Sequence, residues 1–194
     1  MSQEVEIKFK PSGGGDAAAV TPTNPLPVAL TAAAGLSDGY SASVTLTRTA
    51  DTNAYAANDV LGAATGATAA LQFASMGPSG GKIIITSATL EIDATAVISG
   101  ETSYNLYLYS VSPPSALGDN AAFDIPSGDR ASLLGKISLG TPVDEGSTLY
   151  IQTDGINKQI ALAGTDLFAY LVTVGGYTPT SARVHKINLQ AVAV

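Results

Sequence analysis

The stretch KIIITSATLEID, residues 82–93, predicts the fold class because its side chains alternate between apolar and polar. We expect one face of this segment to be apolar, formed by Ile84, Ala88, Leu90 and Ile92. The opposite face is polar, with Ser87, Thr89, Glu91 and Asp93. A period of two residues is typical of a half-buried β-strand and not of a helix. The segment therefore predicts a strand that places one face on a core.

Further short segments of this kind follow along the chain, separated by turns rich in Gly and Pro. They are SVTLTRT (43–49), YNLYLYSV (104–111), LLGKISLG (133–140), TLYIQT (148–153), NKQIAL (157–162), DLFAYLVTV (166–174) and ARVHKINLQAVAV (182–194). Segment 166–174 is apolar on both faces, which is typical of a central strand. The alanine-rich passage 62–77 predicts a short strand around Ala69–Ala74, with a single helical turn as the alternative. About eight to ten short strands without a convincing helix predict an all-β, antiparallel β-sandwich, with jelly-roll connectivity.

The first forty residues differ in composition from the rest. VEIKFK (5–10) alternates like a strand, PSGGG (11–15) breaks it, and TPTNPLPVAL (21–30) carries three prolines. Proline removes a backbone donor and disfavours a central strand. We predict an extended N-terminal arm over residues 1–40 and a β-sandwich domain over residues 41–194. A simple tail is the alternative, but the apolar residues of this segment favour an arm that contacts a partner, and they are Val5, Ile7, Phe9, Leu26 and Val28.

Composition excludes several classes of protein. The net charge is −7, with nine scattered Lys and Arg residues, which disfavours a nucleic-acid surface. The absence of cysteine excludes disulfides and thiolate–zinc sites. The start, MSQEVEIKFK, lacks the apolar core of a signal peptide, and no apolar run is long enough to span a membrane. We therefore expect a protein made in a cytoplasm, without a membrane or nucleic-acid partner.

Two motifs that suggest enzymes lack the required context. GPSGG (77–81) matches the nucleophile elbow with Ser79, but an apolar strand follows the serine where the elbow needs a helix. GGK (80–82) lacks the hydroxyl residue and the helix of a phosphate-binding loop. His185 is the single histidine, so we interpret it as a structural or edge residue and not as a metal ligand or a general base. We predict no enzyme activity, no catalytic residue and no cofactor.

The stretch GDNAAFDIPSGD (118–129) contains oxygen donors that calcium could use, namely Asp119, Asn120, Asp124 and Asp129. Their spacing does not fit an EF-hand, and Pro126 and Gly128 indicate a turn, where Asp and Asn are common. We therefore predict no metal site. Phe123 and Ile125 are expected to dock the loop onto the domain or a neighbour, while the aspartates face water.

Tyr107 and Tyr109 are expected to point outward from their strand, with Tyr104 nearby. Tyrosine is common both on sheet surfaces and in protein interfaces. We therefore predict a protein contact for Tyr107, Tyr109 and Phe123, and stacking on a sugar ring stays the alternative.

One long passage resembles structural proteins of tailed-bacteriophage particles. It is NLYLYSVSPPSALGDNAAFDIPSGDRASLLGKI (105–137), in which a strand leads through a proline-bearing loop and DNAAF to a strand containing Leu-Gly. TRTADTNAYAANDVLG (47–62) and NPLPV (24–28) are similar in character, and together the three segments cover under half of the chain.

The resemblance implies a virion component, most simply a capsid decoration or cement protein that stabilises the shell. Its implied partners are the major capsid protein and copies of itself, with a trimer as the expected assembly. It transfers no catalytic, cofactor-binding or metal residue. A receptor-binding or carbohydrate-binding module of a phage tail or head fibre is the alternative.

Overall fold

The computed structural model describes residues 8–9, 18–19, 38–63 and 69–194. The chain divides into two compact units, Met1–Leu36 and Ser37–Val194. In the first unit, strands β1 (Lys8–Phe9) and β2 (Ala18–Ala19) pair antiparallel. Of the predicted arm contacts, Phe9 therefore lies in a strand, while the other four lie outside the described residues: Val5, Ile7, Leu26 and Val28.

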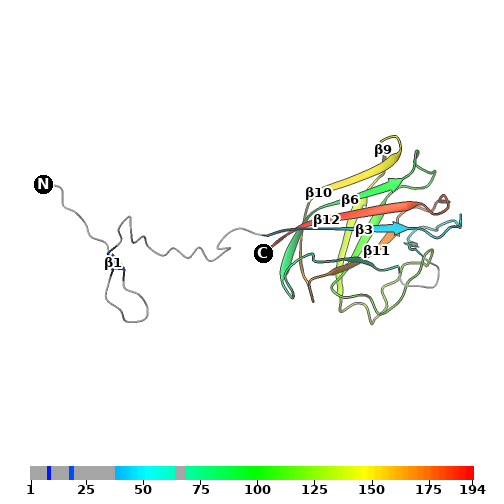
Figure 1. Ribbon diagram of the computed structural model, residues 1–194. Coiled ribbons are helices and arrows are strands. Elements are labelled where there is room, and N and C mark those ends of the chain that lie inside the picture. The colour runs from blue at the N-terminus through cyan, green and yellow to red at the C-terminus, as the bar shows by residue number, and fades with distance from the viewer. Residues whose placement is uncertain (1–7, 10–17, 20–37, 64–68) are drawn as a thin grey trace. The chain divides into compact units, whose positions relative to one another are not determined.

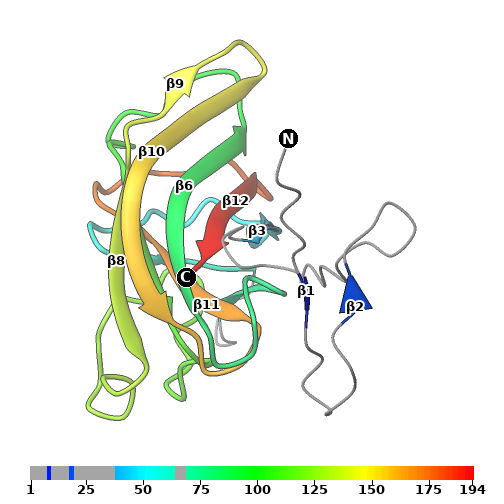
Figure 2. The same ribbon diagram turned by 90° about the vertical axis from the view of Figure 1, so that its left-hand side faces the viewer.

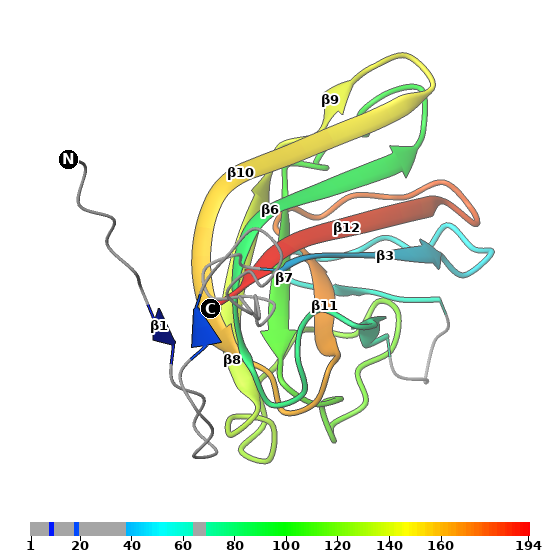
Figure 3. The same ribbon diagram turned by 60° about the vertical axis from the view of Figure 1, so that its left-hand side comes forward.

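The second unit is a sandwich of two antiparallel sheets, seen from three directions in Figures 1, 2 and 3. The first sheet has the order β3-β12-β6-β10-β9, and the second has the order β4-β11-β7-β8 with β5 also paired to β11. The strands of the first sheet are β3 (Gly39–Thr47), β12 (Val184–Ala193), β6 (Lys82–Asp93), β10 (Thr148–Ala161) and β9 (Val143–Asp144). Those of the second are β4 (Val60–Leu61), β5 (Leu71–Phe73), β11 (Leu167–Thr173), β7 (Tyr104–Tyr109) and β8 (Leu133–Gly140).

The connectivity is that of a jelly roll. Strands β4 and β5 both pair with β11 and can be counted as one strand, and the two-residue β9 can be left out. When the remaining eight strands are numbered from 1 to 8 along the chain, the strand order is 1-8-3-6 in the first sheet and 2-7-4-5 in the second. The first strand of the domain thus pairs with the last, and the second with the one before the last. This is the order of two Greek keys folded into a double sheet. The predicted all-β sandwich with jelly-roll connectivity is confirmed.

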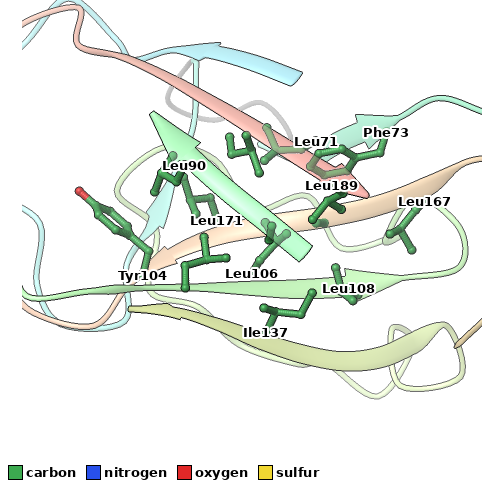
Figure 4. Close-up of a cluster of buried hydrophobic side chains, with 14 of the residues drawn as sticks. Leu71, Phe73, Leu90, Tyr104, Leu106, Leu108, Ile137, Leu167, Leu171 and Leu189 are labelled. Atoms are coloured by element: carbon green, nitrogen blue, oxygen red, sulfur yellow. The ribbon is translucent and has the colours of Figure 1, made fainter. Parts of the chain in front are cut away.

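The main core lies between the two sheets, where alternate side chains of each strand meet. Figure 4 shows leucines of β6 and β12 facing leucines of β7 and β11. The strand β11 is central in its sheet, with β7 on one side and β4 and β5 on the other. It is buried on both faces, as its sequence predicted, because one face packs in the main core and the other in a second cluster with Tyr109. The predicted short strand in the alanine-rich passage is β5.

In β6 the prediction assigned one isoleucine to the wrong face. Ile83 and Ile85 are fully buried, together with Ala88, Leu90 and Ile92, whereas Ile84 lies on the outer face. The cause is an irregularity in the pairing with β12, where Gln190 pairs with Ser87 and the next residue, Ala191, pairs with Ile85. One extra residue at Thr86 reverses the alternation, as a β-bulge does.

Within the described ranges, no helix is long and apolar enough to cross a membrane.

Candidate functional site

The connection between β7 and β8, residues 110–132, covers the outer face of the second sheet. Phe123 packs on Tyr107 with ring centroids 4.0 Å apart, and its ring edge contacts Tyr170 at 6.3 Å. The loop also bonds to the backbone beside β4, because Val60 N–H donates to the Ala121 carbonyl at 2.8 Å. Phe123 N–H donates to the Asn58 carbonyl at the same distance. The loop is therefore docked on its own domain, as predicted for Phe123.

The two tyrosines proposed as outward contacts have different environments. Both point away from the main core, as the alternation predicted, but Tyr109 is fully buried in a second cluster beneath the loop. Tyr107 is half-buried, and Phe123 covers its ring. Burial raises the pKa of Tyr109 to about 12. Tyr109 therefore points outward from the sheet as expected but does not reach the surface, because the loop covers it, and the sequence pattern does not reveal this cover.

A buried polar network occupies one end of the sandwich, centred on Arg48. Its guanidinium contacts the carboxylate of Asp119 at 3.3 Å, and the side chains of both residues are almost fully buried. Tyr55 bridges the pair, since its hydroxyl accepts from Arg48 Nε and donates to Asp119. Asp119 also accepts from the Gly62 N–H at 2.9 Å. The aspartate of the DNAAF segment therefore anchors the loop to the residues that directly follow β3 and β4.

A second buried ion pair lies beside the first. Arg183 Nη1 contacts Glu101 Oε1 at 2.9 Å, and neither side chain is exposed. The Tyr104 hydroxyl donates to the same carboxylate and lies 3.0 Å from the hydroxyl of Tyr177. Burial, followed by the nearby Tyr177 and Glu101, raises the pKa of Tyr104 well above its usual value, so this phenol stays neutral.

The two arginines reach the interior because they continue the inward rows of neighbouring strands. Arg48 has the same parity as Val44 and Leu46 in β3, and Arg183 has the same parity as Ile187 in β12. Backbone pairing also continues past the ends of these strands, with Arg48 N–H donating to the Arg183 carbonyl at 3.0 Å. Two adjacent buried cations require two acids. This parity was the sequence signal that could have revealed the network.

His185 lies between these arginines and the apolar core. It is fully buried on β12, opposite Leu46 and Ile92, and its ring meets Tyr104 edge-on at 6.3 Å. Burial, followed by the charge of Arg183, lowers the pKa of His185 to about 3. The residue is thus a neutral core histidine on a strand with neighbours on both sides, and the edge position considered from the sequence was wrong.

Ser79 and His185 do not form a catalytic pair. Ser79 is exposed in a turn where Gly81 N–H donates to the Pro78 carbonyl, and this turn carries the chain from β5 in one sheet to β6 in the other. His185 is enclosed by the core. A general base must reach the proton of its nucleophile. The geometry of these two residues therefore gives no support to hydrolysis.

The aspartates of the loop were expected to face water, and for two of them this was wrong. Asp119 and Asp129 are buried, whereas Asp124 is exposed and accepts from the adjacent Ile125 N–H at 2.7 Å. Asp129 accepts from Ser115 N–H at 3.2 Å. In the described part of the chain, no cluster of three or more His, Cys, Asp or Glu side chains could hold a metal.

We therefore expect a chelator to leave the protein unchanged. Arg48, Tyr55 and a backbone N–H already neutralise and bind the Asp119 carboxylate, so calcium is not needed to hold the loop. The melting temperature in excess EDTA should match that in buffer to within about 1 °C. A drop of many degrees that added calcium reverses would contradict this prediction.

The contact between Phe123 and Tyr107 should contribute measurably to stability. Phe123→Ala removes a half-buried ring from the second cluster, and we expect a loss of about 2 kcal/mol in the free energy of unfolding. Thermal melts would measure the loss, and limited proteolysis should cut residues 110–132 faster. Asp124→Ala, one residue away and exposed, is the control and should change neither result.

Comparison with known proteins found similar solved structures but no similar sequence family. No family model matches the sequence, and no curated protein matches it. A chain from the capsid of Ralstonia phage GP4 is 16% identical, with a TM-score of 0.36, covering 84% of this chain and 88% of that chain. A chain of Maize Chlorotic Mottle Virus is 10% identical, with a TM-score of 0.29, covering 82% and 94%. A chain of Tomato Aspermy Virus is 9% identical, with a TM-score of 0.28, covering 81% and 78%.

Proposed function

We propose that the chain is a structural protein of a tailed-phage particle, and specifically a decoration protein that binds the capsid shell and stabilises it. One observation carries the proposal. The passage that resembles phage particle proteins folds as a single unit, in which β7 leads through the docked loop to β8. Asp119 and Phe123 of its DNAAF segment both contribute side-chain contacts that hold this loop on the domain.

The buried polar residues of the domain support a binding role and not a catalytic one. Its two buried arginines are paired with buried acids, and the hydroxyls of Tyr55, Tyr104 and Tyr170 bond to these acids or to the backbone. Such a network holds loops in place, and it offers no free acid, base or nucleophile to a substrate. A rigid domain with an N-terminal arm suits a protein that acts by contacting the shell and its own copies.

The alternative, a carbohydrate-binding module of a tail or fibre, receives less support. Its candidate platform was the pair Tyr107 and Tyr109, and the domain already uses both rings internally. A sugar would have to displace Phe123 to stack on Tyr107. Jelly rolls serve lectins as well as capsids, so the fold by itself does not separate the two functions.

Co-sedimentation with particles tests the proposal. The full chain would be mixed with capsid shells of its own phage that lack this protein, and shells and free protein would be separated on a gradient. We expect saturable binding and a higher melting temperature of the decorated shell. Absence of binding to shells, together with binding of defined sugars on a glycan array, would replace this proposal with the alternative.

A further inference from the structure

Three of the four edges of the sandwich carry structural protection. An unprotected edge strand exposes a row of N–H and C=O groups that can pair with another chain, so proteins shorten, bend, charge or cover such edges. In the second sheet, the loop covers the edge at β4, where Val60 bonds to Ala121. The other edge, β8, pairs irregularly with β7 and contains Lys136 and Gly135, the latter at a φ of 100°.

The far edge of the first sheet is protected in a similar way. Strand β9 is only two residues long, and it covers β10 at Leu149 and Tyr150. Farther along, the pairing of β10 with β6 is irregular between Asp154 and Lys158. A short strand and a bulge are both common means of preventing strand addition.

Strand β3, the remaining edge, has none of these features. Its pairing with β12 is unbroken over nine residues, from Thr47 opposite Val184 to Gly39 opposite Val192. The strand GYSASVTLT contains no proline and no charged residue. Among the described residues, no strand pairs with its open side.

The backbone groups on this open side belong to the odd-numbered residues. At one end of β3, Arg48 N–H donates to Arg183, and at the other the Asp38 carbonyl accepts from Ala193, each at 3.0 Å. In an antiparallel pair, N–H and C=O of one residue point to the same side, and the side alternates along the strand. The groups of Ser41, Ser43 and Thr45 therefore point away from β12.

The core is also incomplete beside β3. The inward side chains Tyr40, Ala42 and Val44 pack against the main core but remain half-exposed, whereas Leu46 is only 4% exposed. On the outer face, Ser41 and Ser43 are exposed. A strand that completes this edge must therefore be apolar on its inner face and polar on its outer face.

The chain itself contains a segment with this pattern. In an extended conformation VEIKFK (5–10) would place Val5, Ile7 and Phe9 on one face and Glu6, Lys8 and Lys10 on the other. Its strand β1 pairs with β2, and residues 20–38 then lead to β3 and could extend over roughly 60 Å at about 3.3 Å per residue. A hairpin back to the same β3 would need only about two to five residues. The length of the connection therefore favours a second copy.

We propose that residues 5–9 of one copy add as a strand to the open edge of β3 in a second copy. Main-chain bonds to Ser41, Ser43 and Thr45 would hold the added strand, and its apolar residues would cover Tyr40, Ala42 and Val44. The proposal deepens the proposed function, because it names the surface that the arm binds. Its tests use the protein without shells, so their outcome is independent of shell binding.

The first test blocks the edge at a single backbone group. Ser43→Pro removes an N–H that points away from β12, so the pairing of β3 within the domain keeps its hydrogen bonds. Light scattering should show that the wild-type chain and the control Ser43→Ala self-associate, and that Ser43→Pro loses this association at least tenfold. A monomeric wild-type chain, or equal association of all three proteins, would overturn the proposal.

The second test does not depend on whether the proline variant folds. The chain has no cysteine, so introduced pairs can be trapped as disulfides without background. The variant Lys8→Cys/Thr45→Cys should form cross-linked dimers and larger species under mild oxidation. The control Lys8→Cys/Ser138→Cys places the second thiol on the protected edge β8 and should cross-link at least fivefold less. Disulfides confined to single chains, or equal cross-linking of the two variants, would refute addition to the β3 edge of a second copy.

Discussion

Replacing Asp119 with alanine should lower the free energy of unfolding by about 3–5 kcal/mol, because it leaves a buried arginine without its countercharge. Asp119 and Arg48 are 3.3 Å apart, and the exposed fractions of their side chains are 1% and 0%. The same substitution removes the acceptor for Tyr55 and for the Gly62 N–H. Urea unfolding followed by circular dichroism measures the loss.

Asp51 provides a matched control for this experiment. It contacts the same guanidinium at 3.0 Å, but its side chain is 26% exposed. Asp51→Ala should therefore cost less than about 1 kcal/mol, since exposed pairs contribute little. Equal losses for the two alanine variants would show that burial of the Asp119 pair is not the source of its effect. The double variant Arg48→Met/Asp119→Leu should regain part of the stability, because it removes both charges together.

Acid should destabilise the protein through its single histidine. The pKa of His185 is lowered from 6.5 to about 3 by burial, so between these values the unfolded chain binds a proton that the folded chain does not. The stability that this group contributes is fully present above pH 6.5 and is lost as the pH falls toward 3. Between pH 7.5 and pH 4.5 the loss should be about 3 kcal/mol, because only the roughly two pH units below 6.5 contribute, at about 1.4 kcal/mol each.

His185→Leu isolates this effect from the titration of carboxylates. The variant has no histidine, and it keeps an apolar group beneath Tyr104. Its unfolding free energy should fall by about 3 kcal/mol less than that of the wild-type chain over the same pH range. Unfolding titrations at several pH values measure both slopes. Parallel curves would mean that His185 takes up its proton in the folded state near its ordinary pKa.

Periodicity was sufficient to predict the sandwich, because each strand buries one face and so records its environment in alternate residues. The signal failed where one residue interrupts the period, as at Thr86, because a bulge has no sequence signature within the strand. It also failed for Tyr109, which is covered by the connection that begins at the next residue, because the period of a strand does not tell where the following loop folds. Local patterns describe a strand, and they do not describe what packs on it.

The buried network was missed for a different reason. Arg48 follows the inward parity of β3, yet an arginine at the end of a strand is usually solvated. Its partner Asp119 lies 71 residues away, in a stretch whose composition predicts only a turn. The folded arrangement brings the two charges together. The sequence offered one signal, namely that Arg48 and Arg183 both continue the inward rows of their strands and so need buried acids as partners.

The pairing of the first strand with the last also determines when the domain can fold. Strand β3 must wait for β12, which begins more than 130 residues later in the chain. At about 5–20 residues per second, a ribosome needs roughly seven to thirty seconds to synthesise that interval. Long-range pairings of this kind are formed late and slowly. The first sheet can therefore close only after β12 has been synthesised, and until then β3 has no strand to pair with.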